Sequence, residues 1–161
     1  MNIFHLNECP ELSVKPMYNK HVVKMILETA QLLCTAHHIY NNGDNVPYKM
    51  THKNHPSTIW ARENTANYNW LYCHFIALCD EYTYRYGKVH STDTKLRIAL
   101  QQIPTNIPEK HMTPFKLAMG SNPECILEDA VESYRRFYET KQKRFTMVWT
   151  KRPVPKWFNA I

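Results

Sequence analysis

The sequence predicts a mainly α-helical fold: a compact, single helical domain with long ordered loops and a basic, aromatic C-terminal tail. Glycine accounts for only 3 of the 161 residues, whereas tight hairpins and glycine-rich phosphate loops need glycine to reach positive φ. Two long segments also repeat apolar residues at the i, i+3, i+4, i+7 spacing of an amphipathic helix. We therefore expect at least half of the residues to be helical, and no sheet larger than a short two-stranded ribbon.

The length of the chain suits one domain, residues 1–161, with a core that needs no disulfide or metal. No apolar run approaches the roughly 18 residues of a membrane-spanning helix, and the first residues lack the apolar stretch of a signal peptide. We expect no membrane partner and a cytoplasmic location. The five cysteines contain no C-x-x-C pair and the histidine spacings match no standard zinc finger, so we expect reduced thiols and no metal site.

The first helix is expected over residues 17–38, after an irregular segment, residues 1–16. The Asn41-Asn42-Gly43-Asp44 sequence predicts its end. A second long helix is expected over residues 58–86, with Ser57 as its N-cap and Gly87 just beyond its C-terminus. These two helices should pack together as the core of the molecule.

Shorter elements follow. We expect a helix over residues 92–103 with Ser91 or Thr92 as cap, and then a proline-rich ordered loop over residues 104–124. A fourth helix is expected over residues 126–141. The basic and aromatic tail, residues 144–161, either lines a groove for a polyanion or packs its tryptophans over the helices as a lid, and we favour the lid.

The first helix carries a group of residues that could perform chemistry. Spacings of three and four place Lys20, Lys24 and Glu28 on one stripe, with His21 beside it. A lysine amine beside another cation can act as a nucleophile toward a sugar aldehyde, and a histidine or glutamate can move the proton. Lys20 is the preferred nucleophile and His21 the preferred proton shuttle. The alternative is a solvated helix face with one Lys–Glu pair.

Positive charge and aromatic residues together suggest a nucleic acid partner. The chain has a formal net charge of +6, and 12% of its residues are aromatic, a combination that suits phosphate contacts and base stacking. The alternative is that the aromatic residues are core and the cations are solvated. The candidate DNA-binding residues are Lys49, Lys53, Asn54, Arg62, Tyr68, Arg85, Lys88, Lys151 and Arg152.

Four segments carry a resemblance to known proteins. Residues 20–33, 54–62, 81–88 and 149–158 resemble a family of small phage-encoded proteins of unassigned function. The order of elements is more distantly similar to the phage pyrimidine-dimer DNA glycosylases, the T-even ultraviolet endonucleases of the endonuclease V type. This wider similarity includes Glu11-Leu12, the basic first helix, His55 at the start of the long helix, and the aromatic tail.

The resemblance implies an activity. That family attacks the sugar C1′ with the α-amine exposed after removal of Met1, assisted by a glutamate of the first helix. This sequence departs from the pattern at two places. Asn2 is large enough for Met1 to be retained, and His21 or a neighbour stands where the glutamate is expected, with Glu28 about two turns later.

The sequence thus predicts a DNA glycosylase for a pyrimidine dimer or modified base, with possible abasic-site lyase activity through an imine. Its partner is damaged or modified double-stranded DNA, and it needs no cofactor and no obligatory protein partner. The active centre is expected between the first helix and the Asn54-His55 corner, with Lys20, His21, Lys24, Glu28 and His55 as catalytic candidates. The alternatives are a non-catalytic binder of nucleic acid or of a phosphorylated nucleotide, acting in phage counter-defence, and an enzyme acting on free nucleotides.

Overall fold

The computed structural model describes all 161 residues and confirms a mainly α-helical fold. Helices occupy 48% of the chain, close to the expected half, and no strand is present. The α-helices are α1 (Asn19–Asn41), α2 (Pro56–Arg62), α3 (Thr65–Tyr86), α4 (Ser91–Leu96) and α5 (Ala130–Glu139). Three short 3₁₀ helices complete the set: η1 (Ala99–Gln101), η2 (Pro123–Cys125) and η3 (Thr140–Lys143). None of these helices is both long and apolar enough to cross a membrane.

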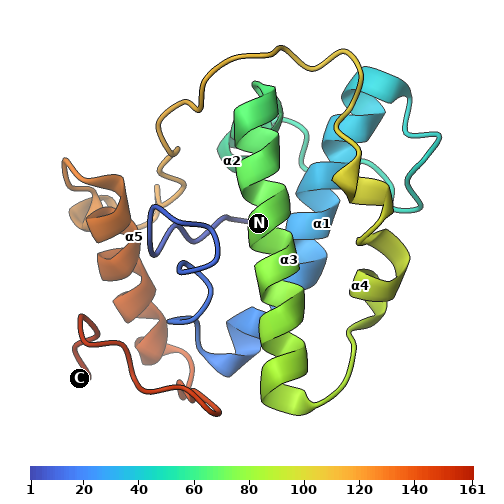
Figure 1. Cartoon of the computed structure of the whole chain (residues 1–161). Coiled ribbons are helices and arrows are strands. Elements are labelled where there is room, and N and C mark those ends of the chain that lie inside the picture. Colours follow the sequence, from blue (N-terminus) through green and yellow to red (C-terminus); the bar gives the residue numbers. More distant parts are fainter.

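The two long helices, α1 and α3, lie side by side and run in opposite directions (Figure 1). Their facing sides bury Val22, Ile26 and Leu33 of α1 and Leu71 and Phe75 of α3, and α2 packs against both helices. The prediction that the two long amphipathic segments form the core together is therefore confirmed. The core is one cluster of 33 buried hydrophobic residues that extends from the N-terminal segment to α5.

The helix expected over residues 58–86 is in fact two helices, with a break at Glu63 and Asn64. Asn64 has extended backbone, and its side chain accepts a hydrogen bond from the Asn67 backbone N–H at 2.9 Å. The Asn67 side-chain amide then donates to the carbonyl oxygen of Trp60 at 2.8 Å. The Trp60 carbonyl oxygen near the end of α2 and the Asn67 backbone N–H in the first turn of α3 therefore both have hydrogen-bond partners across the break.

The predicted helix ends are partly right. Asn42 (φ 58°) and Gly87 (φ 66°) end α1 and α3 in the left-handed conformation, as expected. The predicted N-cap Ser57 is wrong, because the His55 ring accepts the capping bond from the Ser57 backbone N–H at 3.1 Å. His90 similarly caps α4 in place of Ser91 or Thr92.

The two later helices are shorter than expected. α4 stops at Leu96, and the 3₁₀ helix η1 follows where the expected helix continued. α5 begins at Ala130 because the Asp129 side chain caps it, accepting from the Glu132 backbone N–H at 2.8 Å. The preceding residues run as a loop, which joins the long proline-rich stretch that crosses the molecule (Figure 1).

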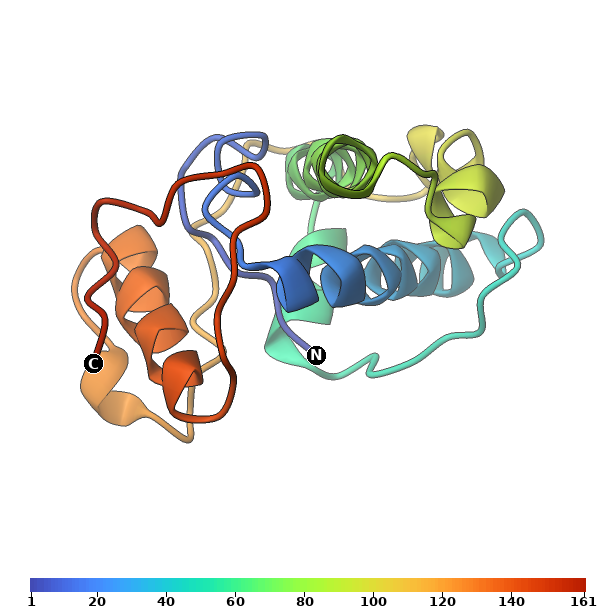
Figure 2. The ribbon, with the colours of Figure 1, turned by 90° about the horizontal axis from the view of Figure 1, so that it is seen from below.

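The N-terminal segment, residues 1–16, lies between α5 and the α1–α3 pair in both overall views (Figures 1 and 2). Ile3, Phe4 and Leu6 are buried there. Their side chains therefore form part of the hydrophobic core between α5 and the α1–α3 pair. The Tyr18 backbone N–H donates to the Tyr138 hydroxyl at 3.0 Å, which ties the start of α1 to α5. The first residues are therefore held in place by packing from both sides.

The C-terminal tail packs against the helices, as the lid interpretation expects. The Trp149 indole N–H donates to the Pro16 carbonyl oxygen at 2.7 Å, and the Thr150 backbone N–H donates to the Asn19 side chain at 3.0 Å. The Trp157 ring meets Tyr138 of α5 edge-on, with ring centroids 6.3 Å apart. The tail thus connects α5 with the start of α1.

Candidate active site

A cavity of about 310 Å³ opens where the start of the chain, the first three turns of α1 and the end of α5 meet. Its walls combine apolar rings with four charged side chains. The lining residues are Met1, Asn2, Phe4, His21, Lys24, Met25, Glu28, Ala118, Phe137, Lys141, Arg144 and Phe145. Three of the predicted catalytic residues, His21, Lys24 and Glu28, are therefore brought together in one cavity.

Glu28 is the acidic group of this cavity. Its side chain is only 15% exposed, and its Oε1 lies 3.2 Å from the Lys24 ammonium, whose side chain is 64% exposed. The spacing of one helical turn allows this pair, as the sequence suggested. Because Lys24 extends into solvent while Glu28 is largely covered, the carboxylate is held at the wall of the cavity.

His55, at the start of α2, is not among the residues that line the cavity, but the charges of the α-amine and of Glu28 act on its ring. Burial lowers the pKa of His55, the positive α-amine and His52 lower it further, and Glu28 opposes the effect. His55 is fixed at the start of α2 by its capping bond to Ser57. The α-amine and the Glu28 carboxylate thus line one cavity, while the His55 imidazole interacts with both only electrostatically.

His21 is buried, with 6% of its surface exposed. Its ring stacks on Phe4 with centroids 4.6 Å apart and meets the edge of Tyr138 at 5.1 Å. Burial, reinforced by the charges of Lys24 and Lys141, lowers the pKa of His21 to about 3. The ring is therefore neutral near neutral pH and a poor proton carrier there, which argues against the predicted role as proton shuttle.

Lys20 does not line the cavity. It lies one turn before Lys24 on the exposed surface of α1, with its ammonium 5.2 Å from the centre of the Phe145 ring. The structure does not place Lys20 among the cavity residues, and its role as the nucleophile stays a prediction. Lys24 is the lysine of α1 that reaches the cavity.

Two cations of the cavity were missed from the sequence. Lys141 and Arg144 come from η3 and the residue that follows it. The Lys141 ammonium lies 3.8 Å from the centre of the Phe137 ring, and burial lowers its pKa, with further lowering from Arg144 and Lys24. Only the fold brings these residues to α1, because more than a hundred residues separate them from it in the chain.

A carboxylate of the first long helix beside the start of the chain is the arrangement that the sequence resemblance implies. The family description for pyrimidine dimer DNA glycosylases matches residues 1–95. The chain belongs to this family. The matched region runs from the N-terminal segment through α1, α2 and α3 to α4. No curated protein and no solved structure matches the chain.

Only some of the cavity residues of this glycosylase family member lie in the region that matches the family. Met1, His21, Lys24 and Glu28 lie inside the matched region, whereas Lys141 and Arg144 lie outside it. The amine and the carboxylate therefore belong to the part shared with the family, and the opposite wall belongs to the remainder of the chain.

The candidate DNA-binding residues before α2 are accessible. Lys49, Lys53 and Asn54 are exposed in the loop that joins α1 to α2. Arg62 at the end of α2 is half-buried, its Nη1 atom is covered and unpartnered, and burial lowers its pKa. The loop residues are free to meet phosphate groups, whereas much of the Arg62 side chain is covered by protein.

Tyr68 and Arg85 are not accessible to DNA in this structure, which corrects their prediction. Tyr68 is fully buried, and its hydroxyl lies 2.8 Å from His37 Nε2 and donates to the Leu100 carbonyl oxygen at 2.8 Å. Arg85 is 3% exposed and donates to Glu81 at 2.8 Å and to Asn19 at 3.0 Å. Both side chains hold the fold together.

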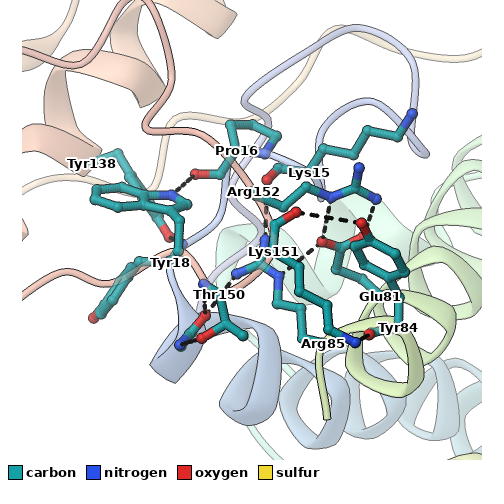
Figure 3. Close-up of polar contacts among 12 residues, drawn as sticks. Lys15, Pro16, Tyr18, Glu81, Tyr84, Arg85, Tyr138, Thr150, Lys151 and Arg152 are labelled. Atoms are coloured by element: carbon teal, nitrogen blue, oxygen red, sulfur yellow. Dashed lines mark hydrogen bonds and ion pairs between the residues drawn. The ribbon is translucent and has the colours of Figure 1, made fainter. Parts of the chain in front are cut away.

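Arg152 from the tail joins the same buried cluster (Figure 3). It donates to both carboxylate oxygens of Glu81, at 2.9 and 3.0 Å. Burial alone would raise the pKa of Glu81, but the hydrogen bonds and charges of Arg152 and Arg85 hold the pKa below its usual value. Arg152 is thus engaged in attaching the tail to α3, while Lys88 and Lys151 are exposed. No three side chains of histidine, cysteine, aspartate or glutamate are grouped as a metal site.

Proposed function

We propose that the protein is a DNA N-glycosylase with abasic-site lyase activity, and that the α-amine of residue 1 is its nucleophile. The observation that supports this proposal is that Met1 and Glu28 line one cavity. An amine can attack the sugar C1′ directly, and the covalent intermediate divides a difficult displacement into two easier steps. The proposal places the reaction in the cytoplasm, on double-stranded DNA with a damaged base.

The chemistry follows from the two groups. The α-amine attacks in its unprotonated form: its nitrogen forms a bond to C1′ as the bond between C1′ and the base breaks, and the base leaves with the electron pair and takes up a proton from water. The nitrogen then loses a proton, the bond between C1′ and O4′ breaks, and O4′ is protonated, which gives an imine between the amine and C1′. The Glu28 carboxylate stabilises the positive charge that develops at C1′, and it can accept the C2′ proton when the bond between C3′ and its phosphate oxygen breaks.

Three cations at the cavity would hold the DNA backbone. Lys24, Lys141 and Arg144 line the same cavity, and no acidic residue other than Glu28 lines it. Phosphate groups on either side of the damaged nucleotide are the natural ligands of such cations. The cations would therefore position the sugar above the amine, and the exposed Lys49, Lys53 and Asn54 would extend the contact along the strand.

Borohydride trapping tests the proposal. Purified protein is incubated with duplex DNA that carries an abasic site, the imine is reduced, and the adduct is digested and mapped by mass spectrometry. We expect the adduct on residue 1, and we expect Lys20→Ala and Lys24→Arg to be trapped as well as the unmodified sequence. Acetylation restricted to the α-amine should abolish the adduct.

Two results would contradict the proposal in different ways. An adduct on Lys24 or Lys141 would retain the lyase activity but assign it to another amine. Failure to trap any adduct on abasic or ultraviolet-irradiated DNA would favour a protein that binds nucleic acid without turnover.

A further inference from the structure

Asn2 joins the proposed nucleophile to the rest of the fold. Met1 is half-buried at the cavity, whereas Asn2 is only 8% exposed. No backbone hydrogen bond uses the α-amine of Met1, so the amine is free to react but is not itself held in place. The position of the amine therefore depends on how firmly the next residue is fixed.

The amide of the Asn2 side chain is bonded at both ends. Its Nδ2 donates to the Ala118 carbonyl oxygen at 2.9 Å, and its Oδ1 accepts from the Ile3 backbone N–H at 2.8 Å. The first bond connects residue 2 to the long proline-rich loop, and the second fixes the side chain against its own backbone. Buried polar groups that are paired in this way resist displacement, because breaking a bond would leave an unpaired donor or acceptor.

Tyr134 of α5 holds the loop to which Asn2 is bonded. The Tyr134 side chain is fully buried, and its hydroxyl donates to the Lys116 carbonyl oxygen at 2.5 Å and accepts from the Ala118 backbone N–H at 3.2 Å. The Asn2 Oδ1 atom lies 3.3 Å from the same hydroxyl. Residue 2, the loop and α5 therefore form one connected network, and Ala118 is also part of the cavity wall.

We propose that Asn2 is a positioning residue, which fixes the start of the chain so that the α-amine of Met1 is held at the cavity that Glu28 also lines. This inference rests on the proposed function and adds a residue to its machinery. Consecutive Cα atoms are about 3.8 Å apart, and a misplacement of about 1 Å can already cost about 10²-fold in rate. The site therefore needs the amine of the residue directly before Asn2, and an amine displaced by one residue reacts poorly.

The first test removes the anchor. Asn2→Leu loses both hydrogen bonds of the amide but keeps Met1, because methionine aminopeptidase removes Met1 only when a small residue follows it. We expect the single-turnover rate of borohydride trapping on abasic duplex DNA to fall by about 10- to 100-fold at saturating DNA. The Kd for the same DNA should be unchanged, since the cations of the cavity are retained. Asn69→Leu, on the exposed face of α3, is the matched control and should change neither value.

The second test moves the amine and leaves Asn2 as it is. With one glycine inserted between Met1 and Asn2, the methionine is removed and the glycine carries the amine at the original position. With two glycines inserted, the amine lies one residue farther out. We expect the first chain to be trapped within about twofold of the unmodified rate, with the adduct on the glycine, and the second to be trapped about 10- to 100-fold more slowly. The mass of each intact chain identifies its first residue.

The proposal is overturned if Asn2→Leu is trapped at the original rate when DNA is saturating, whatever its Kd, or if the two glycine chains are trapped at equal rates. The proposed function stands in either case, as long as the adduct maps to the first residue. An adduct of the unmodified protein on a lysine, or no adduct at all, would remove the proposed function and the role of Asn2 with it. Circular dichroism shows whether Asn2→Leu is folded. If it is not, the two glycine chains decide, because they retain the Asn2 side chain and its hydrogen bonds.

Discussion

Two lysines of α1 show how neighbours decide the role of a residue. Lys20 and Lys24 are one helical turn apart and have the same chemistry. Lys24 is at the cavity and pairs with Glu28 at 3.2 Å, whereas Lys20 lies over the Phe145 ring outside it. The carboxylate that Lys24 pairs with and the amine at the start of the chain are the two groups on which the proposed chemistry depends.

Replacing Glu28 tests the proposed chemistry at the scale of one residue. Glu28→Gln keeps the size of the side chain but removes its negative charge, and we expect the rate of base excision to fall by about 10²–10⁴-fold, the usual contribution of a general acid–base group. Single-turnover assays on ultraviolet-irradiated duplex DNA measure the rate. Glu132→Gln, which affects the exposed α5 pair with Arg135, is the control and should retain full activity. A Glu28→Gln rate within twofold of the original would exclude this role.

At the scale of elements, the junction between α2 and α3 sets the direction of both helices. Asn64 caps α3, and Asn67 joins the end of α2 to the proline-rich loop through the Thr113 hydroxyl at 2.7 Å. His55 caps the other end of α2, and its ring is affected by the charges of the α-amine and of Glu28. The break in the helix therefore lets α2 and α3 take different directions while both keep their caps.

The cap at Asn64 can be tested separately. Asn64→Ala removes the acceptor for the Asn67 N–H, and we expect the free energy of unfolding to fall by about 1 kcal/mol. Urea denaturation monitored by circular dichroism gives the value. Asn69→Ala, on the exposed face of α3, is the matched control and should be neutral or slightly stabilising. Equal effects from both variants would mean that the Asn64 cap does not contribute.

At the scale of the whole molecule, four histidines are buried, His5, His21, His37 and His74, and burial lowers the pKa of each. Burial lowers the pKa of His5 well below its usual value, that of His21 to about 3 and that of His74 to about 4. The unfolded chain binds protons at these rings near pH 6.5, whereas the folded chain does not. Stability is therefore complete above about pH 6.5 and is lost as the pH falls below it.

This loss of stability can be measured at pH values above those at which the carboxylates titrate. Between about pH 6.5 and pH 5, His21 and His74 together should remove about 3 kcal/mol from the free energy of unfolding, and His5 and His37 should add to this loss. Urea midpoints across that range report it. His111→Gln replaces an exposed loop histidine and should leave the pH dependence unchanged. A free energy that stays constant down to pH 5 would contradict the neutral state of the buried rings.

The cations at the cavity predict how DNA binding responds to salt. If Arg144 contacts a phosphate, Arg144→Ala should weaken binding and reduce the slope of log K against log salt by about 0.9. Lys95→Ala is the control, because Lys95 lies on α4 over the Tyr48 ring, on the opposite side of the molecule from α5 (Figure 2). Fluorescence anisotropy at several salt concentrations gives both slopes. Equal slopes for the two variants would place the DNA elsewhere.

The sequence was most informative where the determinants are local. The stops at Asn42 and Gly87 depend on single residues, and both were predicted. Asparagine is a common N-cap residue, so Asn64 could have indicated the break. The helical spacing of apolar residues continues from α2 into α3, however, and therefore predicted one unbroken helix. The surroundings of Arg85 and Lys141 depend on residues far along the chain, Asn19 and Lys24, so they could not be deduced from spacing alone.

The pairing of Glu81 with Arg152 has a consequence for synthesis of the chain on the ribosome. α1, α2 and α3 leave the exit tunnel first, while the tail that pairs with Glu81 and the α5 residue that bonds Tyr18 are still untranslated. Lys141 and Arg144 emerge in the same late portion of the chain. A nascent protein therefore holds its proposed amine and carboxylate before it holds the wall that faces them, and the complete cavity forms only once Lys141 and Arg144 have left the tunnel.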